Sequence, residues 1–178
     1  MIEILNLNSL RNIYNCFMIN DFPEDELKPF EMIEELIKAD KSVALGYYDN
    51  DVLKGYATIL FAGKNLLLDY FAIINSYRGK GYGTRFLSEL KEYFKDYGFL
   101  LIESENNNSE TARKRIEFYK RCGCKDSKLR GRLYFVEYAF LYLELSGSCS
   151  SENVEEEILN IYKIIYPNYL NTEYLEFH

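Results

Sequence analysis

Residues 66–84 read Leu66-Leu67-Leu68-Asp69-Tyr70-Phe71-Ala72-Ile73-Ile74-Asn75-Ser76-Tyr77-Arg78-Gly79-Lys80-Gly81-Tyr82-Gly83-Thr84. This stretch decides the fold, because it joins a strand to a helix through a glycine-rich turn. The run Leu66–Ile74 is apolar apart from Asp69, which is typical of a strand buried on both faces. Three alternating glycines then open an amphipathic helix that we predict over Gly81–Tyr97, with Gly98 as its left-handed cap.

The glycine turn has the chemistry of a phosphate-binding loop. Glycines at alternate positions leave successive backbone N–H groups uncovered, and Arg78 and Lys80 add to the partial positive charge of the helix N-terminus. A P-loop would carry lysine directly after its last glycine, where this chain has Thr84. A dinucleotide fingerprint would have its third glycine three residues after the second, and neither pair of glycines here is followed by one. The expected ligand is a phosphate or pyrophosphate.

The segments on either side predict a mixed α/β domain of about seven strands. Alternating or continuous apolar patterns indicate strands, and apolar residues spaced by three and four indicate helices. The expected strands are Ile2–Leu7, Ser42–Tyr48, Val52–Phe61, Leu66–Ile74, Phe99–Glu105 and the strand-rich segment Arg132–Leu145. The expected helices are Leu10–Ile19, Phe30–Ala39 and one that Ser109 caps and that runs to Gly123. We expect a single domain over residues 1–178, with a core in residues 1–145 and a Ser-rich linker and C-terminal helix in residues 146–178.

Composition and charge exclude several classes of function. With 178 residues, of which 48% are hydrophobic, the chain has the size of one domain. Its net charge of −7 argues against general nucleic-acid binding, which depends on a surplus of lysine and arginine. The single histidine, His178, is the last residue, so Ser–His–Asp, Cys–His and His-ligated zinc sites lack their central residue. We therefore expect no metal.

The cysteines and the hydropathy pattern indicate the cellular setting. Cysteines 16, 122, 124 and 149 are spaced like neither a disulfide framework nor a zinc site, so we expect them to be reduced. The N-terminus lacks the basic region of a signal peptide, and no apolar run approaches the ~18 residues of a membrane helix. The expectation is a cytoplasmic protein that does not bind membranes.

Two motifs in order give the chain a family resemblance. The pattern Arg-x-x-Gly-x-Gly, at Arg78, Gly81 and Gly83, resembles the acyl-CoA pyrophosphate loop of the GNAT-type N-acetyltransferases. Downstream, Arg115-Ile116-Glu117-Phe118-Tyr119-Lys120-Arg121-Cys122-Gly123 is similar to the family's helix ending in an aromatic-Tyr-x-x-x-Gly pattern. The resemblance covers about residues 1–145. It departs from the family at Cys124, where phenylalanine is usual, and in the C-terminal helix.

The resemblance implies the fold, the cofactor and the reaction. The fold would be a central twisted, mostly antiparallel sheet flanked by helices, and acetyl-CoA would be the co-substrate. Its pantetheine arm would pair with the backbone of Phe71, Ala72 and Ile73. Its pyrophosphate would bind the loop formed by Arg78, Gly79, Lys80, Gly81, Tyr82, Gly83 and Thr84. The acetyl group would pass directly to an amine of a small molecule, peptide or protein, and the enzyme would be a monomer or a homodimer.

Direct transfer requires a base for the amine and benefits from an acid for the departing thiolate. By the resemblance, Tyr119 is the acid; the competing interpretation is a core aromatic residue. Glu103 is the first candidate for the base, followed by Asp69 and Glu105. Each carboxylate could instead be solvated or serve as a structural ion-pair partner, and a water-relayed base is a further alternative.

The acceptor and the alternative function depend on other features. Helices Leu10–Ile19 and Phe30–Ala39 and the joining segment Asn20–Lys28 are expected to wall the acceptor site. The alternative to an enzyme is a CoA-binding or acyl-CoA-binding module without catalysis, which would need neither Tyr119 nor a usable carboxylate. Tyr119 together with one usable carboxylate therefore discriminates between the two interpretations.

Overall fold

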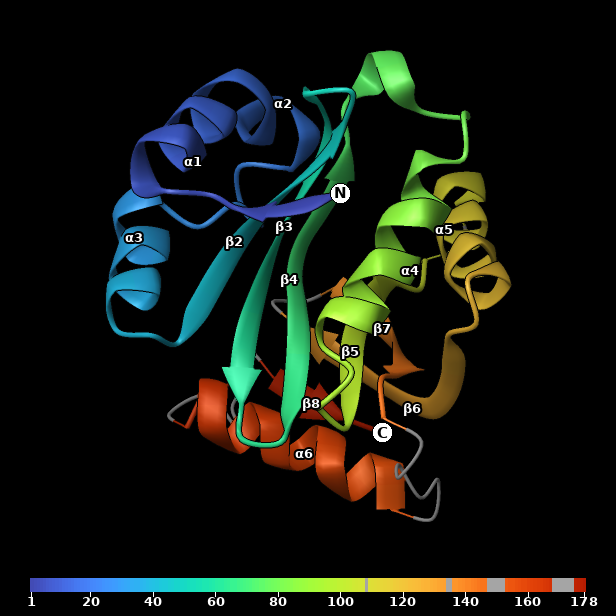
Figure 1. The fold of residues 1–178 in the computed structure, drawn as a ribbon. Helices are drawn as coiled ribbons and strands as arrows, with labels where there is room; N and C mark the ends of the chain where they lie inside the picture. Colours follow the sequence, from blue (N-terminus) through green and yellow to red (C-terminus); the bar gives the residue numbers. More distant parts are fainter. Residues whose placement is uncertain (108, 134–135, 147–152, 168–174) are drawn as a thin grey trace. The chain divides into compact units, whose positions relative to one another are not determined.

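The computed structural model describes residues 1–107, 109–133, 136–146, 153–167 and 175–178 (Figure 1). The chain forms two compact units. The first comprises Met1–Leu60 and Asp69–Leu90, and the second comprises Phe61–Leu68 and Lys91–His178. The fold is the expected mixed α/β arrangement, in which a mostly antiparallel sheet is flanked by helices. The predicted linker lies largely in residues 147–152, outside the described residues.

The elements that lie wholly or mainly in the first unit are β1 (Ile2–Ile4), α1 (Leu7–Ile13), the π-helix η1 (Tyr14–Met18), α2 (Ile19–Asp21), α3 (Phe30–Lys38), β2 (Ser42–Asp49), β3 (Val52–Ala62), β4 (Asn65–Ile73), the 3₁₀-helix η2 (Asn75–Tyr77) and α4 (Tyr82–Tyr93). Strands β1 and β3 both pair antiparallel with β2. The predicted strands Ser42–Tyr48 and Val52–Phe61 therefore form a hairpin. Asn50 and Asp51 close it with φ of 51° and 59°, as a tight hairpin turn requires.

The amino-terminal helical segment begins earlier than predicted and is not uniformly α-helical. The side chain of Asn6 accepts a hydrogen bond from the backbone N–H of Ser9 at 2.9 Å and so caps α1. The first strand consequently ends at Ile4 rather than at Leu7. In place of one α-helix over Leu10–Ile19, α1 passes into the π-helix η1 and then into α2. Apolar residues on these helices pack against α3 and the strands in one buried cluster, which includes Leu10, Ile13, Met18, Phe30, Ile33, Tyr56 and Tyr70.

The second unit holds the remaining elements, which are β5 (Phe99–Glu105), α5 (Glu110–Arg121), β6 (Lys125–Leu133), β7 (Val136–Glu144), α6 (Val154–Ile165) and β8 (Leu175–Phe177). Its strand order is β4-β5-β7-β6-β8. Strands β4 and β5 are parallel, whereas the pairs β5–β7, β6–β7 and β6–β8 are antiparallel. Together with the first unit this makes eight described strands where about seven were expected, because β8 was not predicted.

Capping explains the bounds of α5, and a close contact explains why Gly98 is not a cap. The Ser109 side chain accepts a hydrogen bond from the N–H of Ala112 at 3.1 Å, as predicted. The prediction for Gly98 was wrong, since α4 ends at Tyr93 and the φ of Gly98 is not positive. A Cβ at Gly98 would lie 2.5 Å from Asn65 Oδ1, so glycine is needed here for close packing.

The C-terminal helix α6 is confirmed, and it is fixed to the start of β4. Its buried face consists of Val154, Ile158, Ile161 and Tyr162. Glu157 accepts hydrogen bonds from Asn65 Nδ2 at 2.9 Å and from Lys64 Nζ at 2.9 Å. Asn65 also accepts a hydrogen bond from the N–H of Phe99 at 3.2 Å, so a single buried amide joins α6 to β4 and β5.

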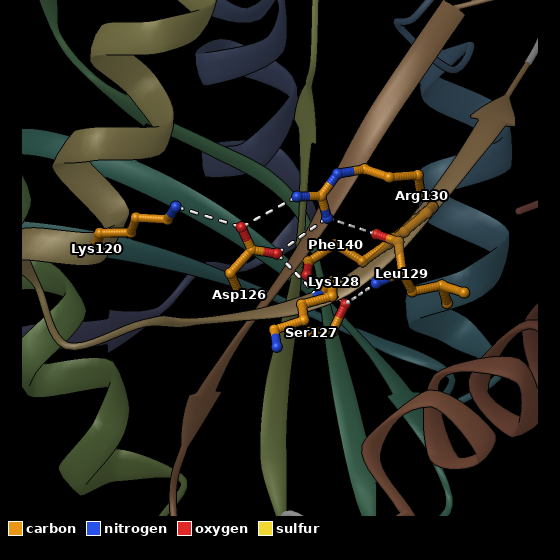
Figure 2. Close-up of polar contacts among 7 residues, drawn as sticks. All are labelled: Lys120, Asp126, Ser127, Lys128, Leu129, Arg130 and Phe140. Carbon is orange, nitrogen blue, oxygen red and sulfur yellow. Dashed lines mark hydrogen bonds and ion pairs between the residues drawn. The ribbon is translucent and has the colours of Figure 1, made fainter.

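Three residues donate to the carboxylate of Asp126 beside a bulge in β6 (Figure 2). Arg130 donates two hydrogen bonds to its carboxylate, at 2.9 and 3.1 Å, and the backbone N–H of Lys128 donates a third at 2.9 Å. Lys120, which follows Tyr119 in α5, lies 3.3 Å away. Burial alone would raise the pKa of the Asp126 carboxyl, but these donors outweigh it and lower the pKa to about 2. The cluster therefore ties the end of α5 to β6.

Replacing Asp126 with asparagine is expected to lower the free energy of unfolding by about 1–2 kcal/mol at pH 7. The folded pKa lies below the usual value of 3.8, so the stabilisation is present above pH 4 and is lost as the pH falls toward 2. The difference in Tm between wild type and Asp126→Asn should be about 2–8 °C at pH 7 and should shrink near pH 2.

Glu117→Gln is the matched control, since Glu117 makes an exposed 3.9 Å pair with Arg121 in the same unit and should change Tm little. An equal Tm difference for Asp126→Asn at pH 7 and pH 2 would contradict the role of the charge.

Candidate functional site

The glycine turn after β4 forms an open cradle of backbone N–H groups. Gly79 and Gly81 have φ of 72° and 80°, and α4 begins directly after them at Tyr82. A Cβ placed on either glycine would meet no heavy atom within 4 Å, so the space above the turn is open. Alternating left-handed residues at a helix start make an anion-binding concavity. Gly83 lies within the first turn of α4, and the cradle itself is carried by Gly79 and Gly81.

The two cations of the turn are held by neighbouring groups of the first unit. Arg78 donates from Nε to the carbonyl oxygen of Ile73 at 2.8 Å, and its Nη2 lies 2.6 Å from Asp21 Oδ1. Tyr56 donates to the other oxygen of Asp21 at 2.7 Å. Lys80 Nζ donates to the carbonyl of Ser76 at 2.9 Å. Half of the Arg78 side chain is exposed, so a carboxylate now occupies one side of a guanidinium that solvent still reaches.

A buried lysine beneath the turn was missed by sequence reasoning. Lys54 on β3 is only 8% exposed, and its ammonium lies 3.9 Å from the ring centroid of Tyr77 and 5.5 Å from that of Tyr82. Tyr82 in turn donates to Asp49 at 2.9 Å. These cation–π contacts hold the positive charge of Lys54 beside Tyr77 and Tyr82, the tyrosines on either side of the glycine turn. A lysine on a predicted strand is ordinarily solvent-facing, so the sequence carries no local signal for this position.

The strand end that should pair with a pantetheine arm is closely packed on one side. A Cβ at Gly55 of β3 would lie 2.7 Å from the carbonyl oxygen of Ala72, which shows how tightly the two backbones approach. The Phe71 ring lies 5.2 Å from the Phe86 ring of α4. The carbonyl of Ile73 already accepts a hydrogen bond from Arg78. An extended ligand would therefore find this carbonyl occupied and would meet Phe71 and Ala72 first.

A cavity of about 600 Å³ opens in the first unit beside the same turn. Its walls come from η1, α2 and the segment between β4 and the glycines. The lining residues are Cys16, Phe17, Asn20, Asp21, Ile74, Asn75, Ser76 and Arg78. Two of them, Cys16 and Phe17, belong to the π-helix, a geometry that is frequent at functional sites. The cavity thus joins the expected acceptor-wall helices to the expected cofactor loop.

Asp69, one candidate base, is an ion-paired carboxylate within the first unit. Its Oδ1 lies 2.5 Å from Lys28 Nζ, and its side chain is 8% exposed. Tyr70 accepts a hydrogen bond from the N–H of Lys28 at 2.8 Å and donates to the carbonyl of Glu26 at 2.9 Å. Burial raises the pKa of Tyr70 to about 12. The acid in an otherwise apolar strand is therefore satisfied by a lysine from the segment before α3.

Tyr119, the candidate acid, is buried in the second unit. Its side chain is 6% exposed, and α5 packs on β5. Burial raises the pKa of the Tyr119 hydroxyl, and the nearby Arg115 lowers it only in part, so the group is protonated at neutral pH. Burial also raises the pKa of the Cys124 thiol to about 12. A thiol with that pKa is not a nucleophile at neutral pH, and Cys124 is instead packed as a small apolar residue.

The carboxylates at the end of β5 have different partners. Glu103 accepts a hydrogen bond from the hydroxyl of Tyr162 in α6. Glu105 accepts one from Asn107 Nδ2 at 2.8 Å and lies 3.4 Å from Arg115 Nη1, which is the ion pair that the competing interpretation of these acids expected. No sequence pattern pointed to Tyr162, because it lies 59 residues from Glu103.

The predicted site residues divide between the two units. Asp69, the strand end Phe71–Ile73 and the loop Arg78–Thr84 belong to the first unit, and Arg78 of this loop lines the cavity. Glu103 and Tyr119 belong to the second, on the adjacent elements β5 and α5. Among the described residues, no group of three or more His, Cys, Asp or Glu side chains is arranged to hold a metal ion. Nor does any helix in the described ranges have the length and apolar character that a membrane span requires.

Comparison with known proteins was made by sequence and by structure. A family model described as the acetyltransferase (GNAT) family matches residues 7–124. No curated protein matches the chain. Among solved structures, one described as a GNAT-family acetyltransferase from Bacteroides thetaiotaomicron has a TM-score of 0.77 at 19% identity, covering 93% of this chain and 98% of that one.

Two further structures share the fold. The ribosomal-protein-S18-alanine N-acetyltransferase from Escherichia coli has a TM-score of 0.65 at 16% identity, covering 86% of this chain and 97% of that one. An acetyltransferase from Bacillus subtilis in complex with CoA has a TM-score of 0.61 at 16% identity, covering 80% of this chain and 97% of that one. At these identities the likeness concerns the fold.

Proposed function

This chain belongs to the acetyltransferase (GNAT) family, and from that premise we propose that it transfers an acetyl group directly from acetyl-CoA to an amine. The observation that carries the proposal is the open cradle at Gly79 and Gly81, which follows β4 and begins α4. A pyrophosphate is the largest anionic group of acetyl-CoA and fits a concavity of backbone N–H groups. That a similar structure is a complex with CoA supports this choice of cofactor.

The cofactor is held by residues of the first unit. The N–H groups of the loop Arg78–Thr84 bind the pyrophosphate, and Lys80 and Lys54 supply positive charge around it. Arg78 exchanges the carboxylate of Asp21 for a phosphate, an anion of higher charge that its exposed side can reach. The pantetheine arm runs along the backbone of Phe71 and Ala72 and places the thioester beyond Ile73.

Tyr119 and Glu103 perform the proton transfers. The amine nitrogen attacks the thioester carbonyl, its proton passes to Glu103, and the departing CoA thiolate receives a proton from Tyr119. A tyrosine hydroxyl is protonated at neutral pH, which is the state that an acid requires. Glu103 suits the base better than Asp69 does, because Glu103 is bound by a neutral hydroxyl, that of Tyr162, whereas the Asp69 carboxylate is paired with the Lys28 ammonium at 2.5 Å.

The acceptor amine enters the cavity of about 600 Å³ beside the cofactor loop. Its walls combine apolar side chains with amide, hydroxyl and carboxylate groups, which suits an amine carried on a polar body. The Escherichia coli structure is named for an acceptor that is an alanine of a ribosomal protein, so both peptide and small amines belong in the test. We place the reaction in the cytoplasm, because the thiols of Cys16 and Cys124 fit a reducing compartment.

Mass spectrometry of a panel of peptide and small-molecule amines, incubated with the protein and acetyl-CoA, tests the proposal. We expect at least one amine to gain an acetyl group in an enzyme-dependent manner. Cys16→Trp is expected to raise the KM of that amine by about tenfold or more, because Cys16 lines the cavity and the larger side chain would occupy the space that the amine needs. The KM of acetyl-CoA should remain within about twofold.

Cys16→Ser is the matched control, because it keeps the size of the side chain and should leave both KM values unchanged. A Cys16→Trp variant in which only the KM of acetyl-CoA rises would show that the cavity receives the cofactor and not the amine. A panel with no acetylated amine would refute the proposed reaction.

A further inference from the structure

The C-terminal helix α6 contacts the candidate base directly. The hydroxyl of Tyr162 donates a hydrogen bond to Glu103 Oε1, and the Tyr162 side chain is 1% exposed. Helix α6 lies beyond residue 124, where the match to the family model ends. The group that holds the carboxylate is therefore supplied by a part of the chain outside the matched region.

The ring of Tyr162 is fixed over the same strand pair that carries Glu103. Glu103 of β5 lies directly opposite Phe140 of β7, so both side chains are on one face of the sheet. The Tyr162 ring lies edge-on to Phe140, with centroids 5.9 Å apart, and edge-on to Phe177 of β8 at 5.0 Å. Phe177 also contacts Phe140 at 5.4 Å. The contacts of the Tyr162 ring with Phe140 of β7 and Phe177 of β8 thus fix the position of its hydroxyl.

A second attachment fixes the helix independently of this contact. Glu157, near the start of α6, binds Lys64 and Asn65 at 2.9 Å each. One attachment is polar and lies at the start of β4. The other consists of the aromatic contacts of Tyr162 with Phe140 and Phe177 and the hydrogen bond of its hydroxyl to Glu103. Because the helix is held at two places, removing one hydroxyl should leave α6 in position.

We propose that Tyr162 is a positioning residue for the transfer reaction, holding Glu103 in one rotamer and in its ionised form. The inference rests on the proposed function, in which Glu103 removes the proton of the amine. A hydroxyl that donates to a carboxylate stabilises the charged form and removes the rotational freedom of the side chain. Without that donor, Glu103 would retain a proton to higher pH and would be available as a base over a narrower range.

The test measures kcat/KM against pH with one acceptor amine for wild type, Tyr162→Phe, Glu103→Gln and Glu157→Gln. Tyr162→Phe keeps the aromatic contacts and removes only the hydroxyl. We expect Tyr162→Phe to shift the acidic limb of the kcat/KM profile upward by about one pH unit. The free energy of a hydrogen bond to a charged group corresponds to about one pH unit. Glu103→Gln should lower kcat/KM at neutral pH and recover much of that loss at high pH, where the free amine is abundant. The KM of acetyl-CoA should not change, and because the amine is the same throughout, any shift reports a group of the enzyme.

Glu157→Gln is the control for a purely structural role of α6. It weakens the other attachment and should lower Tm while leaving the acidic limb in place. If Glu103→Gln shows this pH-dependent loss and Tyr162→Phe leaves the acidic limb unmoved, this inference is wrong and the proposed function stands. If wild type acetylates no amine, or if Glu103→Gln has no effect, the proposed function or its choice of base fails first, and the inference fails with it.

Discussion

Replacing Tyr119 with phenylalanine is expected to lower turnover by about 100-fold or more while leaving the affinity for acetyl-CoA unchanged. The substitution keeps the ring, which is buried on α5, and removes only the hydroxyl. That hydroxyl is protonated at neutral pH, so it can donate its proton to the departing thiolate. Its loss leaves the thiolate to depart without a positioned acid. Single-turnover rates and a CoA-binding titration on the same preparation measure the two effects separately.

Tyr142→Phe is the matched control for Tyr119→Phe. Tyr142 is also a buried tyrosine of the second unit, on β7, so the same atom is removed from a comparable environment. Its turnover should stay within about twofold of wild type. Equal losses in both variants would mean that a buried hydroxyl matters only for packing, and wild-type turnover in Tyr119→Phe would make Tyr119 a core residue. The second result would mean that the enzyme transfers the acetyl group without this acid.

Elements with strong local signals were predicted well. The strand Phe99–Glu105 was predicted with its observed bounds, because a run of apolar residues begins after Gly98 and ends at a polar loop. Helix α5 was predicted from the Ser109 cap, whose side-chain hydrogen bond is present. In each case the deciding interaction joins residues within one turn or one strand of each other, which is the range over which a sequence pattern carries information.

Elements defined by their neighbours were not predicted. Strand β6 (Lys125–Leu133) is rich in charged residues and contains a bulge, so it lacks a simple alternation and exists because β7 and β8 pair with it. The π-helix η1 has the same apolar spacing as an α-helix, since Tyr14 and Phe17 face the core in either geometry. The strand β8 has three residues, too few for a periodic signal.

The partners of the candidate carboxylates could not be predicted from the sequence either. Asp69 was recognised as an acid that must be satisfied or functional, but Lys28, its partner, lies 41 residues away. Glu103 is bound by Tyr162 from a helix that the family resemblance does not cover. The chemistry of each residue can be read locally. Whether its lone pairs are already taken depends on long-range packing, and that decides between a base and a structural acid.

Gly81→Val is expected to abolish the stabilisation that acetyl-CoA gives to the wild-type protein. At a ligand concentration 100 times Kd, binding should raise the wild-type Tm by about 5–10 °C, whereas NAD and ATP should do so much less. Gly81 has φ of +80°, which a β-branched residue adopts only with strain, and its Cβ would stand in the open space above the N–H groups. Gly63→Val is the matched control, because Gly63 also has a positive φ, of 64°, but lies in the turn between β3 and β4, outside the loop. Both variants should be less stable than wild type without ligand, and only Gly63→Val should keep the acetyl-CoA shift. An undiminished shift in Gly81→Val would mean that the glycine turn does not bind the pyrophosphate.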